Sequence, residues 1–345
     1  MLISRGTPDK ASAPVALTIG NFDGGHLGHR AMLTRLTESA SSGGLVSCVL
    51  TFEPHPREFF TPESAPVRLT NLREKLEWFA SLGVERTHIC RFDRNFAELS
   101  AQNFIERVVC RGLDAKWLLV GDDFRFGRGR EGDLALLQSA GEKFGFEVAV
   151  MPSVTVSEKR VSSTRVRNAL ALGDLQQAAV LLGRPYSISG RVAHGDKTGR
   201  KIGFPTANIR IKHPRPPLGG IFAVEIAGIA ERPLKGVASL GVRPTIKENG
   251  APLLEVYVLD FDREVYGQHV RVDFLHKLRN EEKYPDVETL KTQIGRDVEN
   301  AKSFFNRGGR GGNQESSHEN PDQTYPALAS DNKEDFPLRP RRPPR

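Results

Sequence analysis

Two histidines three residues apart, His26 and His29, stand in a glycine-rich stretch that follows the apolar run Val15–Ile19. If a strand ends there, the glycines allow a tight turn, and the first turn of the next helix directs free N–H groups and its positive dipole end at an anion. Residues i and i+3 share a helix face, so both imidazoles could donate to one phosphate group. A glycine-rich turn with solvated histidines is the alternative. We assign to this nucleotide phosphate site Gly20, Asp23, His26, Gly28 and His29.

A second cluster of phosphate-binding residue types runs from Ser162 to Arg167, with the sequence Ser-Ser-Thr-Arg-Val-Arg. It opens a predicted helix with hydroxyl groups and two guanidinium groups, and an anion at such a place is stabilised by N–H groups and arginine together. Ser163, Thr164 and Arg167 are the candidates for phosphate binding. A Ser/Thr helix cap with solvated arginines is the alternative.

The segment Thr51-Phe52-Glu53-Pro54-His55-Pro56 follows another apolar run. Its two prolines fix the loop and leave an aromatic ring and an imidazole to meet a flat ligand ring. A rigid exit from a strand is the alternative. We assign to this candidate site Phe52, Pro54, His55 and Pro56.

A different chemistry is indicated by Gly203-Phe204-Pro205-Thr206-Ala207-Asn208, which follows a glycine-rich stretch containing Gly195 and Gly199. Mg²⁺ prefers hard oxygen ligands, so the Thr206 hydroxyl, the Asn208 amide oxygen and the phosphates of ATP make a plausible metal site. The glycines are candidates to hold the nucleotide. An ordinary turn is the alternative.

Glu255 is a single carboxylate in the alternating stretch that runs from Leu254 to Leu259. A glutamate on a strand is rigidly placed to accept the proton of a hydroxyl group that is being phosphorylated. A residue on the solvent face of an antiparallel strand is the alternative. We therefore interpret Glu255 as a candidate general base.

The elements that must position these residues fall into two patterns. The first is an alternation of strands and helices, which favours a parallel sheet covered on both faces and ligands at the carboxyl ends of its strands. Its predicted strands are Val15–Ile19, Leu45–Phe52, Thr87–Phe92, Lys116–Val120 and Phe146–Val150, and its predicted helices are Asn71–Leu82, Gln102–Arg111 and Asp133–Phe144. The candidate phosphate and ring-binding motifs follow these strands.

A helical pair from Ser163 to Leu182 and a boundary near Gly183 precede the second pattern, a series of short strands with glycine turns. Such a series predicts a small closed β-barrel. The predicted strands are Tyr186–Val192, Ile221–Ile226, Gly236–Leu240, Leu254–Leu259 and Val270–Phe274, followed by a helix over Val287–Phe305 whose apolar face is Leu290, Ile294, Val298 and Ala301. Domains are predicted at 15–183 and 184–306, between an N-terminal segment 1–14 and a disordered tail 307–345.

Composition is that of a two-domain globular protein of 345 residues. The sequence has no apolar run of about 18 residues and no signal peptide core at its start, so we expect a cytoplasmic protein. Cys48, Cys90 and Cys110 are far apart and indicate neither disulfides nor a zinc site. The net charge of +7 permits nucleic-acid binding but equally suits an enzyme with polyanionic substrates.

The stretch from Gly20 to His29 resembles the GNFDGxHxGH form of the HxGH signature found in the flavin branch of the nucleotidylyltransferases. Later segments resemble further motifs of one family: TFxPHP at Thr51, GxDFxFG at Gly121, SSTxxR at Ser162, GFPTAN at Gly203 and LRxExxF at Leu278. Because these motifs occur in the expected order from about residue 16 to 305, the chain is identified as a member of the bacterial bifunctional riboflavin kinase/FMN adenylyltransferase (FAD synthase) family.

The resemblance implies an α/β Rossmann-like nucleotidyltransferase domain followed by a small antiparallel riboflavin kinase-like barrel with a C-terminal helix. It places the ring-binding loop beside the flavin, Asp123 against the nucleotide, the catalytic glutamate of the kinase at Glu255, and Arg279 in a flavin-side loop. Gly25 stands where the family more often has valine, which predicts looser packing behind the motif. The Asp123 and Arg279 assignments rest on the resemblance alone.

The implied activity is bifunctional. The barrel phosphorylates riboflavin with ATP and Mg²⁺ to FMN, and the first domain joins AMP from a second ATP to FMN, which yields FAD and pyrophosphate. We expect riboflavin, FMN and ATP as substrates, a monomer or weak homo-oligomer, and no membrane or nucleic-acid partner. The alternatives are an adenylyltransferase whose barrel has lost catalysis and an RNA-binding protein, since Arg307–Gly312 resembles an RGG element.

Overall fold

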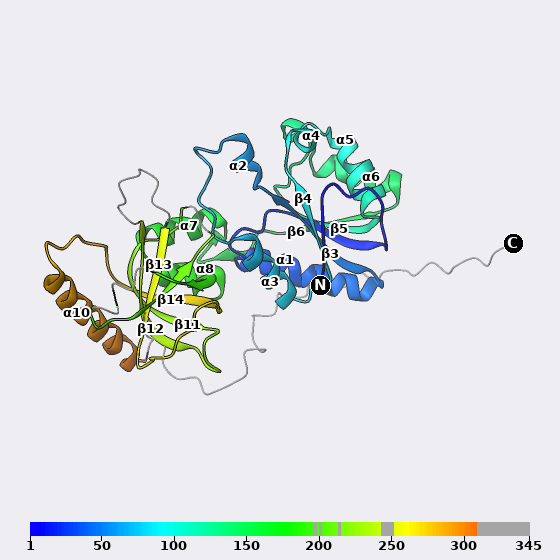
Figure 1. Ribbon diagram of the computed structural model, residues 1–345. Helices are drawn as coiled ribbons and strands as arrows, with labels where there is room; N and C mark the ends of the chain where they lie inside the picture. Colours follow the sequence, from blue (N-terminus) through cyan, green and yellow to red (C-terminus); the bar gives the residue numbers. More distant parts are fainter. Residues whose placement is uncertain (196–198, 200–201, 213–214, 243–251, 309–345) are drawn as a thin grey trace. The chain divides into compact units, whose positions relative to one another are not determined.

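The computed structural model describes residues 1–195, 199, 202–212, 215–242 and 252–308 (Figure 1). Its first part is a sheet of six parallel strands in the order β1-β4-β3-β2-β5-β6. The strands are β1 (Leu2–Arg5), β2 (Val15–Ile19), β3 (Val46–Glu53), β4 (Arg86–Arg91), β5 (Ala115–Gly121) and β6 (Glu147–Met151). Since β3 and β5 flank β2 on opposite sides, the strand order reverses there, and ligands of such sheets bind at the carboxyl ends of the strands at that point.

Every residue of β2 is buried, which explains why its sequence is a continuous apolar run. Val15, Leu17 and Ile19 join one hydrophobic cluster and Ala16 another, so the sheet has a core on each face. The helical elements of this part are α1 (Leu27–Gly43), α2 (Pro56–Phe60), α3 (Leu72–Ser81), α4 (Arg94–Ala97), α5 (Ala101–Phe104), the π-helix η1 (Ile105–Gly112), the 3₁₀-helix η2 (Arg128–Arg130) and α6 (Leu134–Phe144).

A two-stranded ribbon, β7 (Thr155–Val156) and β8 (Lys159–Arg160), and the helices α7 (Ser163–Leu172) and α8 (Leu175–Leu182) lead to a closed antiparallel barrel. The barrel order is β10-β13-β12-β11-β14-β9, and β9 pairs with β10 to close it. Its strands are β9 (Tyr186–Ala193), β10 (Thr206–Arg210), β11 (Gly220–Ala227), β12 (Leu234–Val242), β13 (Pro252–Val258) and β14 (His269–Arg279).

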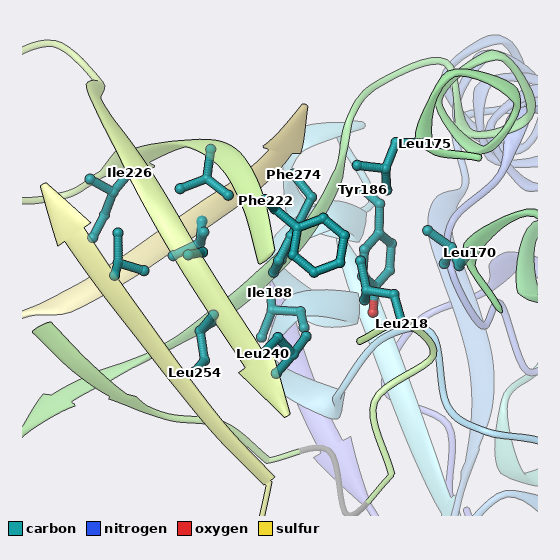
Figure 2. Close-up of a cluster of buried hydrophobic side chains, with 14 of the residues drawn as sticks. Leu170, Leu175, Tyr186, Ile188, Leu218, Phe222, Ile226, Leu240, Leu254 and Phe274 are labelled. Carbon is teal, nitrogen blue, oxygen red and sulfur yellow. The ribbon is translucent and has the colours of Figure 1, made fainter. Parts of the chain in front are cut away.

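The barrel core continues into α7 and α8 (Figure 2). Leu170 and Leu175 from the helical pair lie in the same buried cluster as Tyr186, Phe222 and Phe274 from the barrel. A second cluster joins the barrel wall to α10 (Val287–Asn306), through Val298, Ala301 and Phe305. The helical pair is therefore packed as part of the barrel's core.

The fold class predicted from sequence is confirmed, and the five predicted strands of the sheet match the observed ones to within one residue at each end. Within the described residues, the prediction missed one strand of the sheet and one of the barrel, besides the short ribbon of β7 and β8. β1 lies in the segment 1–14 and is a four-residue edge strand with Leu2 and Ile3 largely exposed, so it lacks a buried apolar signal. β10 lies in the GFPTAN motif, where a proline and polar residues obscure a strand that pairs with β9 and β13.

Smaller differences concern the helices and the end of the barrel. The predicted helix Gln102–Arg111 is α5 followed by the π-helix η1. The predicted helical pair Ser163–Leu182 is confirmed as α7 and α8, which are separated at Gly173 in a left-handed conformation. Leu278 and Arg279 end β14, although they were assigned to a loop. Nothing in the described ranges is a helix long and apolar enough to cross a bilayer. The predicted disordered tail lies outside the described residues beyond Gly308.

Candidate active sites

The two histidines of the glycine-rich stretch stack on each other at the start of α1. His26 caps the helix, because its Nδ1 accepts the backbone N–H of His29 at 3.3 Å. The two ring centroids are 3.6 Å apart with an interplanar angle of 15°. An imidazole whose Nδ1 accepts a hydrogen bond carries its proton on Nε2 when it is neutral. His26 can therefore donate one hydrogen bond to a ligand through Nε2.

Burial keeps both rings uncharged near neutral pH. Desolvation lowers the pKa of His26 from 6.5 to about 4 and lowers the pKa of His29 well below its usual value. The Nδ1 atom of His29 is buried with no hydrogen-bond partner among the described residues. Since buried polar atoms are normally paired, this atom marks a position for a ligand or solvent molecule. The pair can thus act as neutral donors to a phosphate group.

The low pKa of His26 predicts a loss of stability in mild acid. Below pH 6.5 the unfolded chain binds a proton at His26, whereas the folded protein does not bind it until about pH 4. The free energy of unfolding that this group provides is therefore fully present above pH 6.5 and is lost as the pH falls toward 4. A shift of this size corresponds to about 3 kcal/mol. Unfolding midpoints of the wild type should fall more steeply between pH 7 and pH 4.5 than those of His26→Gln, whose remaining slope reports the other groups. Equal slopes would contradict the assignment.

Asp23 is buried and its carboxylate is used by the protein itself. It accepts the backbone N–H groups of Leu69 and Thr70 at 3.0 to 3.1 Å and pairs with Arg167 Nη2 at 2.5 Å. Arg167 Nε also donates to a backbone carbonyl, that of Val67, at 2.6 Å. The structure therefore joins the two predicted phosphate motifs through an ion pair. Direct contact of Asp23 with a nucleotide stays a prediction, and the observed contacts favour a role in orienting Arg167.

The first turn of α7 brings the remaining residues of the second motif to the same place. Ser162 caps the helix by accepting the N–H of Arg165, and Ser163 Oγ donates to the backbone oxygen of Asp23 at 2.9 Å. Thr164 is exposed on that turn. The helix-cap alternative is thus correct for Ser162, while Ser163 and Arg167 lie against the loop that carries the histidines.

The predicted looseness behind Gly25 is wrong. Gly24 and Gly25 have φ angles of 86° and 56°, which L side chains rarely adopt. A Cβ atom on Gly25 would lie 2.9 Å from ring atoms of Trp78. Trp78 therefore fills the space that a larger residue at position 25 would occupy, and the packing is tight.

The ring-binding loop is held by the half-buried guanidinium of Arg68, which the sequence did not reveal. Arg68 donates to both carboxylate oxygens of Glu53 at 2.8 and 3.0 Å and also pairs with Glu58. These contacts raise the pKa of Arg68 and lower that of Glu58. His55 caps α2 by accepting the N–H of Arg57 at 3.1 Å, and the Glu53–Pro54 peptide is cis. The ion pairs of Arg68 and the helix cap at His55 therefore hold the loop in place.

Phe52, at the end of β3 just before this loop, belongs to an aromatic cluster. Its ring lies 5.8 Å from that of Phe92, and Phe59 and Phe60 at the end of α2 extend the cluster. The rings of Phe59 and Phe60 are 37% and 62% exposed, so they offer apolar surface to a ligand. The stacking roles assigned to Phe52, Pro54, His55 and Pro56 remain predictions.

Asp123 lies on the exit from β5, at the point where the strand order reverses. Its side chain is 67% exposed and pairs with Arg160 of β8 at 3.0 Å. Phe126 is buried in the core and Phe124 packs on it. Asp123 is therefore accessible to a nucleotide, next to the positively charged guanidinium of Arg160.

The barrel places the predicted kinase residues in one row. In the strand register, Glu255 of β13 lies opposite Asn208 of β10 on one side and opposite Ser239 of β12 on the other. All three line a cavity of about 580 Å³, together with Thr206, Gly195 and Gly199. The residues between these two glycines lie outside the described ranges at 196–198. Glu255 is half-buried on the face of β13 opposite the barrel core and lines this cavity, and its role as general base stays a prediction.

Asn208 is suited to hold a hard cation. Its Oδ1 is buried without a hydrogen-bond partner in the described part of the chain. A Cβ atom on Gly195 would lie 2.4 to 2.6 Å from the Asn208 amide, so only glycine leaves room there. An unpaired amide oxygen beside the Thr206 hydroxyl fits the oxygen ligands that Mg²⁺ prefers.

Arg279 closes another side of the same cavity. Its Nε and Nη2 donate to Asp297 of α10 at 2.7 to 3.2 Å, and Asp297 is only 2% exposed. The Arg279 guanidinium also lies 5.7 Å from the ring of Tyr284. The pair fixes α10 to the end of β14 and holds Arg279 against the cavity, while its contact with flavin remains a prediction.

Two family models match the chain. The one described as FAD synthetase matches residues 9–165, and the one described as Riboflavin kinase matches residues 182–305. The chain is 48% identical over 308 residues to the bifunctional riboflavin kinase/FMN adenylyltransferase of Escherichia coli (strain K12), a match that covers 88% of this chain and 98% of that protein. The chain belongs to the bifunctional riboflavin kinase/FMN adenylyltransferase family.

Other members and one solved structure agree with this family assignment. The Haemophilus influenzae bifunctional riboflavin kinase/FMN adenylyltransferase is 49% identical over 292 residues, covering 84% of this chain and 94% of that protein. A solved structure described as a macrolide-efflux protein from Streptococcus pneumoniae is 28% identical with a TM-score of 0.75, and covers 88% of this chain and 99% of that one. The whole two-part fold is therefore shared.

In this member of the family, sequence reasoning missed several residues that line or support the sites. Lys75 of α3 is 6% exposed, burial lowers its pKa, and its charge further lowers the pKa of the buried His29. In the sequence it is one of several polar residues in an amphipathic helix, so no signal marks it. Arg68, Ser239 and Asp297 were missed because their partners are distant in sequence.

Proposed function

We propose that the barrel phosphorylates riboflavin with ATP to FMN and that the first domain adenylylates FMN with ATP to FAD. The single observation that carries this function is that each of the two matched family regions contains its own group of candidate catalytic residues. The His26–His29 pair lies at the reversal of the strand order, and Glu255 and Asn208 share the barrel cavity.

For the kinase, Glu255 accepts the proton of the terminal ribityl hydroxyl of riboflavin. The hydroxyl oxygen then attacks the γ-phosphorus of ATP, the bond to the bridging oxygen breaks, and ADP leaves. Thr206 and Asn208 would hold Mg²⁺, which neutralises charge on the phosphates of ATP when it is bound. Gly195 and Gly199 leave space for the nucleotide, and Arg279 lies at the cavity wall for the flavin.

For adenylyl transfer, a phosphate oxygen of FMN attacks the α-phosphorus of ATP and pyrophosphate leaves. His26 and His29 donate hydrogen bonds to phosphate oxygens on which negative charge increases in the transition state. Arg167, oriented by Asp23, supplies positive charge, and Ser163 and Thr164 supply hydroxyl groups at a helix N-terminus. The Phe52 to Pro56 loop receives the flavin ring, and Asp123 contacts the nucleotide.

We further propose that the protein acts in the cytoplasm, as a monomer or weak homo-oligomer, without a nucleic-acid partner. Of the RGG element only Arg307 and Gly308 are described, and the basic end of the tail lies outside the described residues. The polar residues around the barrel cavity favour a working kinase over a barrel that has lost catalysis.

The decisive experiment is incubation of the purified protein with riboflavin, ATP and Mg²⁺, followed by chromatography of the flavins over time. FMN that rises first and is followed by FAD is the expected result. Conversion of added FMN alone would mean that the barrel is not a kinase, and accumulation of FMN without FAD would contradict the adenylyltransferase. If no flavin product forms, both assignments fail.

A further inference from the structure

Arg184 joins the beginning of the barrel to the loop that carries the histidines. It lies between α8 and β9, where the second domain begins. Its Nη2 donates to the carbonyl oxygen of Gly24 at 3.0 Å and its Nη1 to that of Gly25 at 3.1 Å. Its guanidinium carbon is 5.9 Å from the Trp78 ring, which itself covers Gly25. One fork of two donors thus holds two successive carbonyl groups.

These two bonds act on the least restrained part of the loop. Glycine populates left-handed and right-handed conformations about equally, so the Gly24–Gly25 pair has little intrinsic preference for its observed φ angles. A peptide unit is planar, so fixing the carbonyl of Gly25 fixes the plane that ends at the Cα of His26. Arg184 therefore restrains the peptide that leads into the helix cap at His26.

Strand β9, which begins two residues after Arg184, also holds the segment behind the loop. Tyr186 donates from its hydroxyl to the carbonyl of Leu69 at 3.0 Å, and Ser189 donates to Glu74 from its N–H at 2.7 Å and its hydroxyl at 3.0 Å. The N–H of Leu69 in turn donates to Asp23, which orients Arg167. Both sides of the phosphate site thus depend on residues that follow Leu182.

We propose that Arg184 is a positioning residue for adenylyl transfer, supplied by the start of the kinase domain. It touches no reacting atom and acts through the Gly24 and Gly25 carbonyls on the His26–His29 pair. The proposal rests on the proposed function of the first domain. It adds that the adenylyltransferase site is completed by the segment that begins the barrel, so the two activities are coupled through structure as well as through FMN.

The test compares full-length Arg184→Gln and Arg184→Lys with a matched control, Arg232→Gln. Arg232 is an exposed arginine of the barrel that lies between β11 and β12. Displacement of catalytic groups by about 1 Å can cost on the order of 10²-fold, so kcat/KM for FMN adenylylation should fall by about 10- to 100-fold in Arg184→Gln. Riboflavin phosphorylation and the control should stay within about twofold of wild type.

Two further measurements, the activity of Arg184→Lys and amide hydrogen exchange in the loop, distinguish a positioning role of Arg184 from a general effect on protein stability. The ammonium group introduced by Arg184→Lys would have donors for both carbonyls, so we expect this variant to recover part of kcat without changing the kinase. Amide exchange of residues 24–29 should be faster in Arg184→Gln than in Arg232→Gln. Wild-type adenylylation in Arg184→Gln, or a parallel loss of both activities and of thermal stability without rescue by lysine, would overturn the proposal.

A failure of the proposed function gives a different result. If the wild-type protein does not adenylylate FMN, the function of the domain is wrong, yet amide exchange still measures the effect of Arg184 on the loop. Unchanged exchange at residues 24–29 in Arg184→Gln would then overturn the positioning role as well.

Discussion

Replacement of Glu255 by glutamine should lower kcat for riboflavin phosphorylation by about 10²–10⁴-fold, the usual contribution of a general base. The amide keeps the shape of the side chain but cannot accept the hydroxyl proton. The register places Glu255 between Asn208 and Ser239 in the cavity, so binding of flavin and ATP should change little and the loss should appear in kcat. Initial rates with saturating riboflavin and ATP, measured as FMN formed, provide the test.

The bifunctional chain contains its own control for this experiment. Adenylylation of added FMN by Glu255→Gln should remain within about twofold of wild type, since the two sets of residues do not overlap. Glu225→Gln is the matched variant, because Glu225 is also a strand glutamate of the barrel but does not line the cavity. A kinase rate in Glu255→Gln that equals that of Glu225→Gln would exclude Glu255 as the base.

In the barrel, the sequence pattern predicted which residues lie on a strand but not which residues on other strands they meet. The alternation around Leu254 predicted a strand and the single carboxylate on it, and both the strand and its access to a cavity are present. The partner Ser239 could not be predicted, since it enters the row only through the register of β12 and β13. Likewise, the GFPTAN motif indicated the Asn208 oxygen, whereas the strand that carries it became visible only through pairing with β9 and β13.

In the first domain, the strands were predictable because burial on both faces requires continuous apolar runs. The edge strand β1 lacks that requirement and was missed. The charged residues that hold the site followed no local rule: Arg68 meets Glu53 and Glu58, and Arg184 meets the carbonyls of Gly24 and Gly25. Such contacts depend on how distant segments pack, which a single sequence does not encode at short range.

The Gly25 position illustrates the same limit. A small residue in the motif suggested a gap, yet the volume is taken by Trp78, more than fifty positions later in the chain. The tight Gly25–Trp78–Arg184 arrangement connects the phosphate loop to α3 and to the start of the barrel. Trp78 thus fills the space beside Gly25, and only the fold shows that these two residues are neighbours.

Replacement of His29 by alanine should lower FMN adenylylation by about 10²–10³-fold, the effect of removing one preorganised donor to developing charge. Burial keeps His29 neutral, so its contribution is a hydrogen bond and not a positive charge. It follows that His29→Asn, which retains a neutral N–H donor, should be more active than His29→Ala, whereas a charge-based role would leave both equally impaired.

The measurement is FAD formed from added FMN and ATP, with riboflavin phosphorylation by the same samples as the internal reference. Because the His29 ring stacks on His26, which caps α1, the alanine variant could also loosen the helix start. A kinase rate within about twofold of wild type together with an unchanged thermal midpoint separates that effect from lost chemistry. Full adenylylation in His29→Ala would instead mean that the phosphates are held by Arg167 and the α7 hydroxyl groups without the histidine pair.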